Sequence, residues 1–102
     1  MNHYQRREDL TIVPELLGLA AEEGRAFMAF HHSMERQDGV IPRKYRELIA
    51  LGVAFTTQCV YCIDTHTKNA RTHGASKQEI AEVAFVAAAV RAGGTLAHSL
   101  LA

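Results

Sequence analysis

The sequence predicts an all-α fold in a single domain that covers residues 1–102. Apolar residues recur three and four positions apart, as on one face of a helix, and almost no segment alternates in the manner of a strand. Prolines and glycines stand where helices would begin and end. A domain of this size buries only a modest share of its surface, so we expect further apolar surface to be covered between subunits.

The N-terminal third predicts an arm and one long helix. Residues 1–12 are polar, and we expect them to form an irregular arm. The helix is predicted over residues 14–37, because Pro14 suits the first helical position and Gly39 follows the end. Its apolar positions are Leu16, Leu17, Ala20, Phe27, Phe30 and Met34.

The middle of the chain predicts two helices, over residues 43–57 and 59–73. Pro42 opens the first, and poor helix formers at positions 56–58 separate it from the second. Gly74 then supplies a left-handed C-terminal cap. The apolar face of the first of these helices consists of Tyr45, Leu48, Leu51, Gly52 and Phe55.

A fourth helix is predicted over residues 77–92. Ser76 and Glu79 have the spacing of a capping box at its start. Beyond Glu82 the helix is apolar on nearly every side, and such a helix must be buried on every side, so we expect a subunit partner. The glycines at 93–94 are predicted to break it before a short C-terminal helix.

The charge pattern excludes several classes of protein. Lys and Arg number 11, as do Asp and Glu, and no basic stripe favours binding to nucleic acid. The N-terminus carries charges where a signal peptide needs an apolar run, and charges interrupt every stretch of membrane-spanning length, so we expect no membrane partner. We therefore predict a cytoplasmic protein, and structural disulfides are rare in that compartment.

The chemistry is concentrated in "FTTQCVYCIDTHTKNARTHGAS", residues 55–76. Cys59 and Cys62 are the only cysteines, and on a helix they would share a face with their sulfurs near disulfide distance. The start of a helix stabilises a thiolate. His66 lies one turn after Cys62 and could take its proton, which is the usual arrangement around an activated nucleophile.

Glu47 is the unexpected residue of the second helix. If the helices joined at residues 56–58 pack antiparallel or crossed, Glu47 faces the cysteine helix. Its carboxylate could then hold the tautomer of His66 or accept a proton through water. The alternative is a solvated Glu47 paired with Arg43 or Lys44.

Less specific interpretations stand beside this one. His66 could be a surface histidine, the cysteines could be two small core residues, and Tyr61 could be a core ring or could cover the thiols. The histidines at 31–32 are interpreted as ordinary helix residues. Zinc could bind Cys59, Cys62 and His66, but a structural zinc site needs four ligands and no second cluster exists. We expect no metal and no cofactor.

These residues carry a resemblance to a known family. Glu47, Cys59, Cys62 and His66 together resemble the E…C-x-x-C-x-x-x-H pattern of the alkyl hydroperoxidase D-like (AhpD-like) proteins, within the carboxymuconolactone decarboxylase family. The segments "RELIALGVAFTTQC" and "HTKNARTHGASKQEIAEV" are also similar to the core of that family. The likeness extends from residue 40 to about residue 92.

The resemblance implies an all-helical fold, assembly as trimers or hexamers, and a proton relay of Glu47 and His66 around a redox-active disulfide, Cys59–Cys62. In alkyl hydroperoxidase D the pair is a weak peroxidase that also passes electrons from lipoamide to a peroxiredoxin. We therefore expect an oxidoreductase for small hydroperoxides and a homohexamer. The reductant would be an external dithiol or a lipoyl group, with a peroxiredoxin as a candidate partner.

Two other functions remain open on the sequence alone. One is a decarboxylase-type lyase that acts on a small carboxylated ring compound and does not depend on cysteines. The other is a non-catalytic helical assembly that senses redox state. Within the favoured function the helix start favours Cys59 as the attacking thiol, whereas the spacing of His66 favours Cys62, which we prefer.

Overall fold

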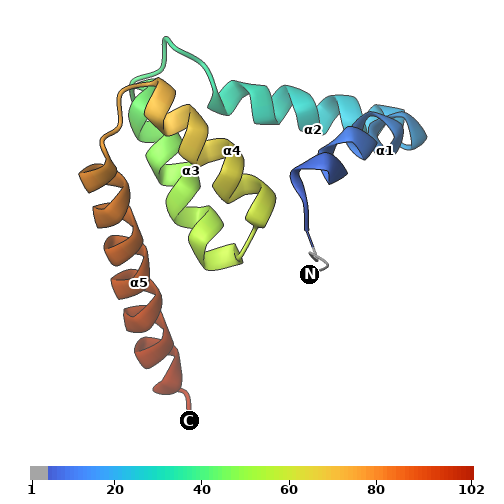
Figure 1. The fold of residues 1–102 in the computed structure, drawn as a ribbon. Coiled ribbons are helices and arrows are strands. Elements are labelled where there is room, and N and C mark those ends of the chain that lie inside the picture. Colours follow the sequence, from blue (N-terminus) through green and yellow to red (C-terminus); the bar gives the residue numbers. More distant parts are fainter. Residues whose placement is uncertain (1–4) are drawn as a thin grey trace.

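The computed structural model describes residues 5–102, and these residues form helices and no strand, which confirms the all-α prediction (Figure 1). The elements are the 3-10 helix η1 (Arg7–Ile12) and the α-helices α1 (Val13–Leu19), α2 (Ala21–Met34), α3 (Arg43–Thr57), α4 (Val60–Thr72) and α5 (Lys77–Ser99).

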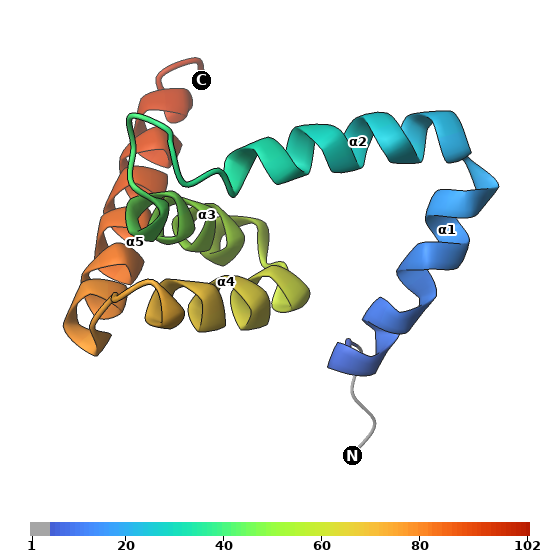
Figure 2. The same ribbon diagram turned by 90° about the horizontal axis from the view of Figure 1, so that it is seen from above.

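The centre of the molecule is an antiparallel pair, α3 and α4, against which the first half of α5 packs (Figure 1). The helices α1 and α2 form a hook that extends away from this pair, and η1 returns to contact α4 (Figure 2). The core is small. Its buried apolar residues are Leu48, Leu51 and Ala54 of α3, Ala70 of α4 and the linker residue Ala75.

The predicted helix over residues 14–37 is two helices that meet at Ala20. Ala20 leaves the helical conformation with φ −130° and ψ 67°, and its carbonyl oxygen accepts a hydrogen bond of 2.7 Å from the N–H of Gly24. The bend brings Gly24 so close to Leu17 that a Cβ atom there would lie 2.8 Å from the Leu17 carbonyl oxygen. The prediction was therefore wrong at Ala20, and α2 also ends earlier, at Met34.

Both ends of the chain are more helical than predicted. Residues 93–94 do not break α5, because neither glycine adopts a positive φ and the Ala-rich run continues the helix to Ser99. Each glycine in a helix costs only about 1 kcal/mol. At the other end, Arg7–Ile12 of the predicted irregular arm is a 3-10 helix, and residues 1–4 of that arm lie outside the described residues.

The signals that bound α4 and α5 act as predicted. Gly74 has φ +96° directly after the end of α4, and the N–H of Ala75 donates to the carbonyl oxygen of Ala70 at 2.9 Å. Ser76 and Glu79 form the capping box, with hydrogen bonds of 2.9 and 3.0 Å. These two caps determine where the cysteine helix ends and the apolar helix begins.

No residue of α5 is buried, although most of the helix is apolar. Phe85 is 78 % exposed, and the last turns extend beyond the α3–α4 pair (Figure 1). The helix has 23 residues and contains an 18-residue stretch with a mean hydropathy of 1.5, enough in length and composition to cross a membrane. A helix that is covered by other protein satisfies the same criteria, and the expectation of no membrane partner stays a prediction.

Candidate active site

The turn between α3 and α4 places the first cysteine at a helix start. Gln58 ends α3 in the left-handed conformation with φ 58° and ψ 38°, which reverses the chain within two residues. Cys59 is the N-cap of α4, and its sulfur accepts a hydrogen bond of 3.2 Å from the N–H of Cys62. The cysteine therefore takes the place that Ser, Thr, Asp or Asn usually fill at a helix start.

Cys59 and Cys62 are joined in a disulfide across this first turn, with their Cα atoms 5.2 Å apart. The bond excludes the interpretation of the cysteines as two unconnected core residues. In this oxidised form the two sulfurs are also not free to bind zinc as thiolates. Within residues 5–102 no group of three or more His, Cys, Asp and Glu side chains could hold a metal ion.

Glu47 and His66 face one another between α3 and α4. The Oε2 atom of Glu47 lies 3.1 Å from Nδ1 of His66, and the side chain of Glu47 is fully buried. A carboxylate only accepts hydrogen bonds, so Nδ1 of His66 is the donor in this contact, and in the neutral imidazole the lone pair then lies on Nε2. His66 is itself only 7 % exposed, which excludes the interpretations of a solvated Glu47 and a surface His66.

Two further side chains bind the same carboxylate. The Oε1 atom of Glu47 accepts hydrogen bonds of 3.3 Å from Nη2 of Arg43 and 3.2 Å from Nδ2 of Asn69. The sequence suggested a pair between Arg43 and Glu47 only for the alternative in which Glu47 is exposed to solvent. Asn69 was missed, although its position three residues after His66 puts it on the same helix face.

A pocket of about 440 Å³ opens beside this site, and it gives Cys62 and His66 a common surface. Cys59 does not line it. The other lining residues are mostly apolar, and they come from α3, from the end of α2 and from the loop between these helices. They are Met34, Ile41, Arg46, Ile49, Ala50, Val53, Ala54 and Thr57.

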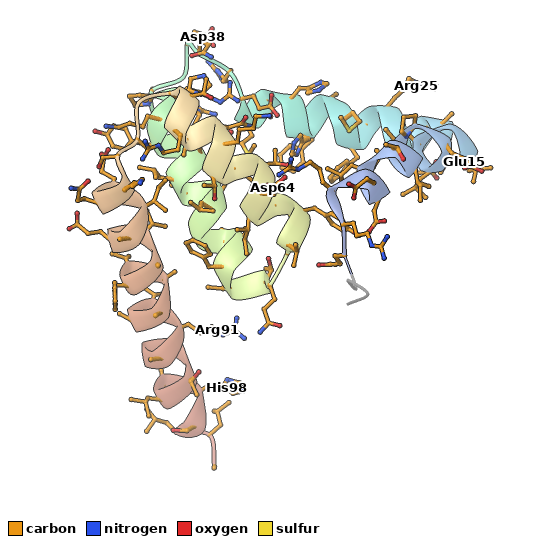
Figure 3. All side chains as sticks on the ribbon, viewed as in Figure 1. Glu15, Arg25, Asp38, Asp64, Arg91 and His98 are labelled. Atoms are coloured by element: carbon orange, nitrogen blue, oxygen red, sulfur yellow. A yellow bond between two sulfur atoms is a disulfide. The ribbon has the colours of Figure 1, made fainter. Side chains whose placement is uncertain are left out.

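Tyr61 lies on another side of α4 and contacts the N-terminal segment. Its hydroxyl donates a hydrogen bond of 2.7 Å to Asp9, and it lines a separate pocket of about 700 Å³. Beside it Arg7 binds both carboxylate oxygens of Asp64, at 2.7 and 2.8 Å, on the side of α4 that faces η1 (Figure 3). Tyr61 thus docks η1 onto the cysteine helix and does not line the pocket of Cys62 and His66.

Hydrogen bonds in and beside this contact lower the pKa of two carboxyl groups. The guanidinium of Arg7 holds the pKa of Asp64 below its usual value. The pKa of Asp9 is lowered by the backbone N–H of Arg6 and then by the hydroxyl of Tyr61. Both carboxyls are therefore ionised near neutral pH.

The chain belongs to the carboxymuconolactone decarboxylase family, whose pattern matches residues 21–102. It is 45 % identical over 62 residues to "Uncharacterized protein 4 in cox locus" of Paracoccus denitrificans, across 61 % of this chain and 56 % of that protein. It is 36 % identical over 67 residues to an uncharacterized protein of Cupriavidus necator, across 64 % of this chain and 59 % of the relative. The matched region thus spans just over half the length of each of these relatives.

Proposed function

We propose that this protein is a thiol–disulfide oxidoreductase of the alkyl hydroperoxidase D-like type, which reduces a small hydroperoxide. The observation that carries the proposal is the buried pair of Glu47 and His66, whose imidazole shares a pocket with one sulfur of the disulfide. Membership of the carboxymuconolactone decarboxylase family supports it. A lyase of the decarboxylase type would have no use for the disulfide.

In the oxidative half of the reaction the pair starts as two thiols. Glu47 accepts the Nδ1 proton of His66 in a hydrogen bond, and Nε2 removes the proton of Cys62. The Cys62 thiolate attacks the terminal peroxide oxygen, the O–O bond breaks, and the alcohol leaves after it takes a proton from His66. Cys62 is then a sulfenic acid. The thiol of Cys59 condenses with it, which releases water and forms the disulfide.

In the reductive half an external dithiol restores the two thiols and itself becomes a disulfide. Its thiolate attacks the sulfur of Cys62, a residue that lines the pocket, and Cys59 leaves as a thiolate. The second thiol of the dithiol then attacks its own sulfur in this mixed disulfide, and Cys62 is released as a thiolate. The N–H of Cys62 and the start of α4 stabilise that leaving thiolate. Cys62 therefore reacts with the hydroperoxide in the oxidative half-reaction and with the dithiol in the reductive half-reaction. A lipoyl-type dithiol, a peroxiredoxin acceptor and a cytoplasmic location remain predictions.

The test is peroxide consumption with dithiothreitol or dihydrolipoamide as reductant. We expect turnover by the wild-type protein and none by Cys62→Ser. Cys59→Ser is the matched control: when it is reduced beforehand and assayed without added dithiol, it should consume about one equivalent of peroxide and stop as a sulfenic acid, because the condensing thiol is missing. Undiminished turnover by Cys62→Ser would contradict the proposal.

We also propose that copies of this chain associate through α5, as a homohexamer. A groove of about 720 Å³ runs between α3 and α5, and apolar side chains such as Val83, Val86 and Val90 line it. Outside the groove α5 exposes further apolar side chains, with Phe85 78 % and Leu96 72 % exposed. Apolar surface on this scale is a mark of an interaction surface.

A further inference from the structure

The carboxylate of Glu47 is held by two residues to which no role has been given. Arg43 approaches it from the preceding turn of α3, and Asn69 approaches it from α4. We propose that Arg43 and Asn69 are positioning residues: they hold the carboxylate of Glu47 in the orientation in which His66 acts as the base for Cys62. This inference rests on the proposed function of the same site.

The two oxygens of Glu47 make different contacts. Arg43 and Asn69 both donate to Oε1, whereas Nδ1 of His66 lies nearer to Oε2, at 3.1 Å, than to Oε1, at 3.4 Å. With Oε1 occupied by two donors, the side chain cannot rotate away from His66 without losing two hydrogen bonds. A fixed Oε2 determines which ring nitrogen of His66 carries the proton, and so leaves Nε2 free for Cys62.

Arg43 lies where not all of its N–H groups can form hydrogen bonds. Its Nε is buried and has no hydrogen-bond partner among the described residues. An unpaired buried donor destabilises a protein. The guanidinium is instead stretched between two acceptors, with Nη1 3.0 Å from the carbonyl oxygen of Glu35 and Nη2 on Glu47. A purely structural arginine would have little reason to leave Nε unpaired.

Among residues 5–102, Arg43 is the one cation other than His66 that contacts Glu47. His66 faces it from α4 and is the group on which it acts. From the end of α2, Glu35 faces Arg43 at 3.8 Å, and His31 lies 3.5 Å from Glu35. Lys44 of α3 is engaged 3.0 Å from Glu79 of α5 and makes no contact with Glu47.

A pH effect of definite sign follows from this arrangement. Without the hydrogen bond from Arg43 or from Asn69, the side chain of Glu47 can turn away from His66 and no longer holds the proton on Nδ1. His66 is then a poorer base for Cys62. Cys62 should then become reactive only at higher pH.

The experiment measures the rate at which iodoacetamide alkylates Cys62 in the reduced protein, from pH 4 to pH 9. The background is Cys59→Ser, so that one thiol is followed. The variants are Arg43→Gln and Asn69→Ala, with Arg43→Lys as the conservative replacement. Lys44→Gln is the matched control, because it removes a neighbouring cation of α3 that does not touch Glu47. Circular dichroism establishes that each variant is folded.

We expect Arg43→Gln and Asn69→Ala each to move the midpoint of the alkylation profile upward by about one pH unit. Arg43→Lys should restore part of the shift, and Lys44→Gln should leave the wild-type profile. If Arg43→Gln does not fold, the profile of Asn69→Ala alone tests the inference. Wild-type midpoints in folded Asn69→Ala would overturn the inference. Because alkylation needs no peroxide, this result is independent of whether the protein reduces hydroperoxides.

Discussion

The α3–α4 pair and the helix α5 differ in how completely each is packed. Between α3 and α4 even a carboxylate is fully buried, and Leu51 is 0 % exposed. Along α5 no residue is buried, and Phe85 is 78 % exposed in spite of a more apolar sequence. The apolar character of a helix therefore does not by itself determine whether it is covered within one chain. A helix is covered only where other helices of the chain pack against it.

The difference separates the two proposals physically. The group that would remove the proton from Cys62 is complete within α3 and α4, because Glu47, His66 and Asn69 all come from these helices. The apolar surface of α5 needs a cover from outside the chain. Changes in the first region should affect stability and chemistry, whereas changes in the second should affect association.

The largest difference in stability should come from cavities. Leu51→Ala removes a fully buried side chain and should lower the free energy of unfolding by about 2–5 kcal/mol. Phe85→Ala on α5 should lower it only where copies associate, so its effect should grow with protein concentration. Chemical denaturation at two concentrations measures both, and equal, concentration-independent losses would remove the distinction between the regions.

Association should respond to a charge on α5. Val86→Asp would place a carboxylate in the proposed interface and should weaken self-association about 100-fold or more. Val40→Asp is the matched control, because Val40 is fully exposed in the loop before α3. Light scattering after size-exclusion chromatography gives the masses. A monomeric wild type, or a Val86→Asp variant with wild-type mass, would contradict the assembly.

Glycine replacements test the packing of the two regions on a finer scale. Gly93→Ala and Gly94→Ala should each raise the free energy of unfolding by about 1 kcal/mol, because open space surrounds both positions within the chain. Gly24→Ala should lower it, because the new Cβ would meet the backbone of Leu17. Thermal unfolding measures all three. Loss of oligomer in the α5 variants would show that the two glycines lie at a close contact between copies.

The smallest effect should be the release of η1 from α4 in acid. Folding lowers the pKa of Asp9 and Asp64, so their stabilisation is complete above the unfolded value of about 3.9 and is lost as pH falls through the folded values. The NMR signals of the Tyr61 ring should shift in that range while those of Tyr45 do not. Asp64→Asn should weaken the contact already at pH 7. A Tyr61 signal that moves only with global unfolding would contradict this order.

Much of the site could be predicted because its signals are local. Helical spacing placed Cys62 and His66 on one face, and the break at residues 56–58 predicted the packing that brings Glu47 opposite them. The caps at Gly74 and Ser76 were equally readable. The role of Arg43 could not be predicted, because an Arg–Glu pair four residues apart has the same sequence pattern whether it is buried or on the surface.

The predictions of the fold were wrong where the structure depends on contacts between residues far apart in the sequence or on the summed helix propensity of many residues. The bend at Ala20 depends on the close approach of Gly24 to Leu17, which helical periodicity does not report. In α5 the expected break at residues 93–94 failed because the surrounding helix formers outweigh two glycines. The 3-10 helix at Arg7–Ile12 is held by contacts with α4 between residues that lie 52 and 57 positions apart in the chain.

The central claim is that Glu47 acts on Cys62 only through His66, and a double-mutant cycle tests it most directly. The measured quantity is the rate of Cys62 alkylation at pH 7 in the Cys59→Ser background, for Glu47→Gln, His66→Ala and the double variant. Residues that act as a unit are not additive. We predict that each single change slows the reaction at least tenfold and that the double variant is no slower than His66→Ala. A double variant slowed by the product of the two single effects would contradict the relay.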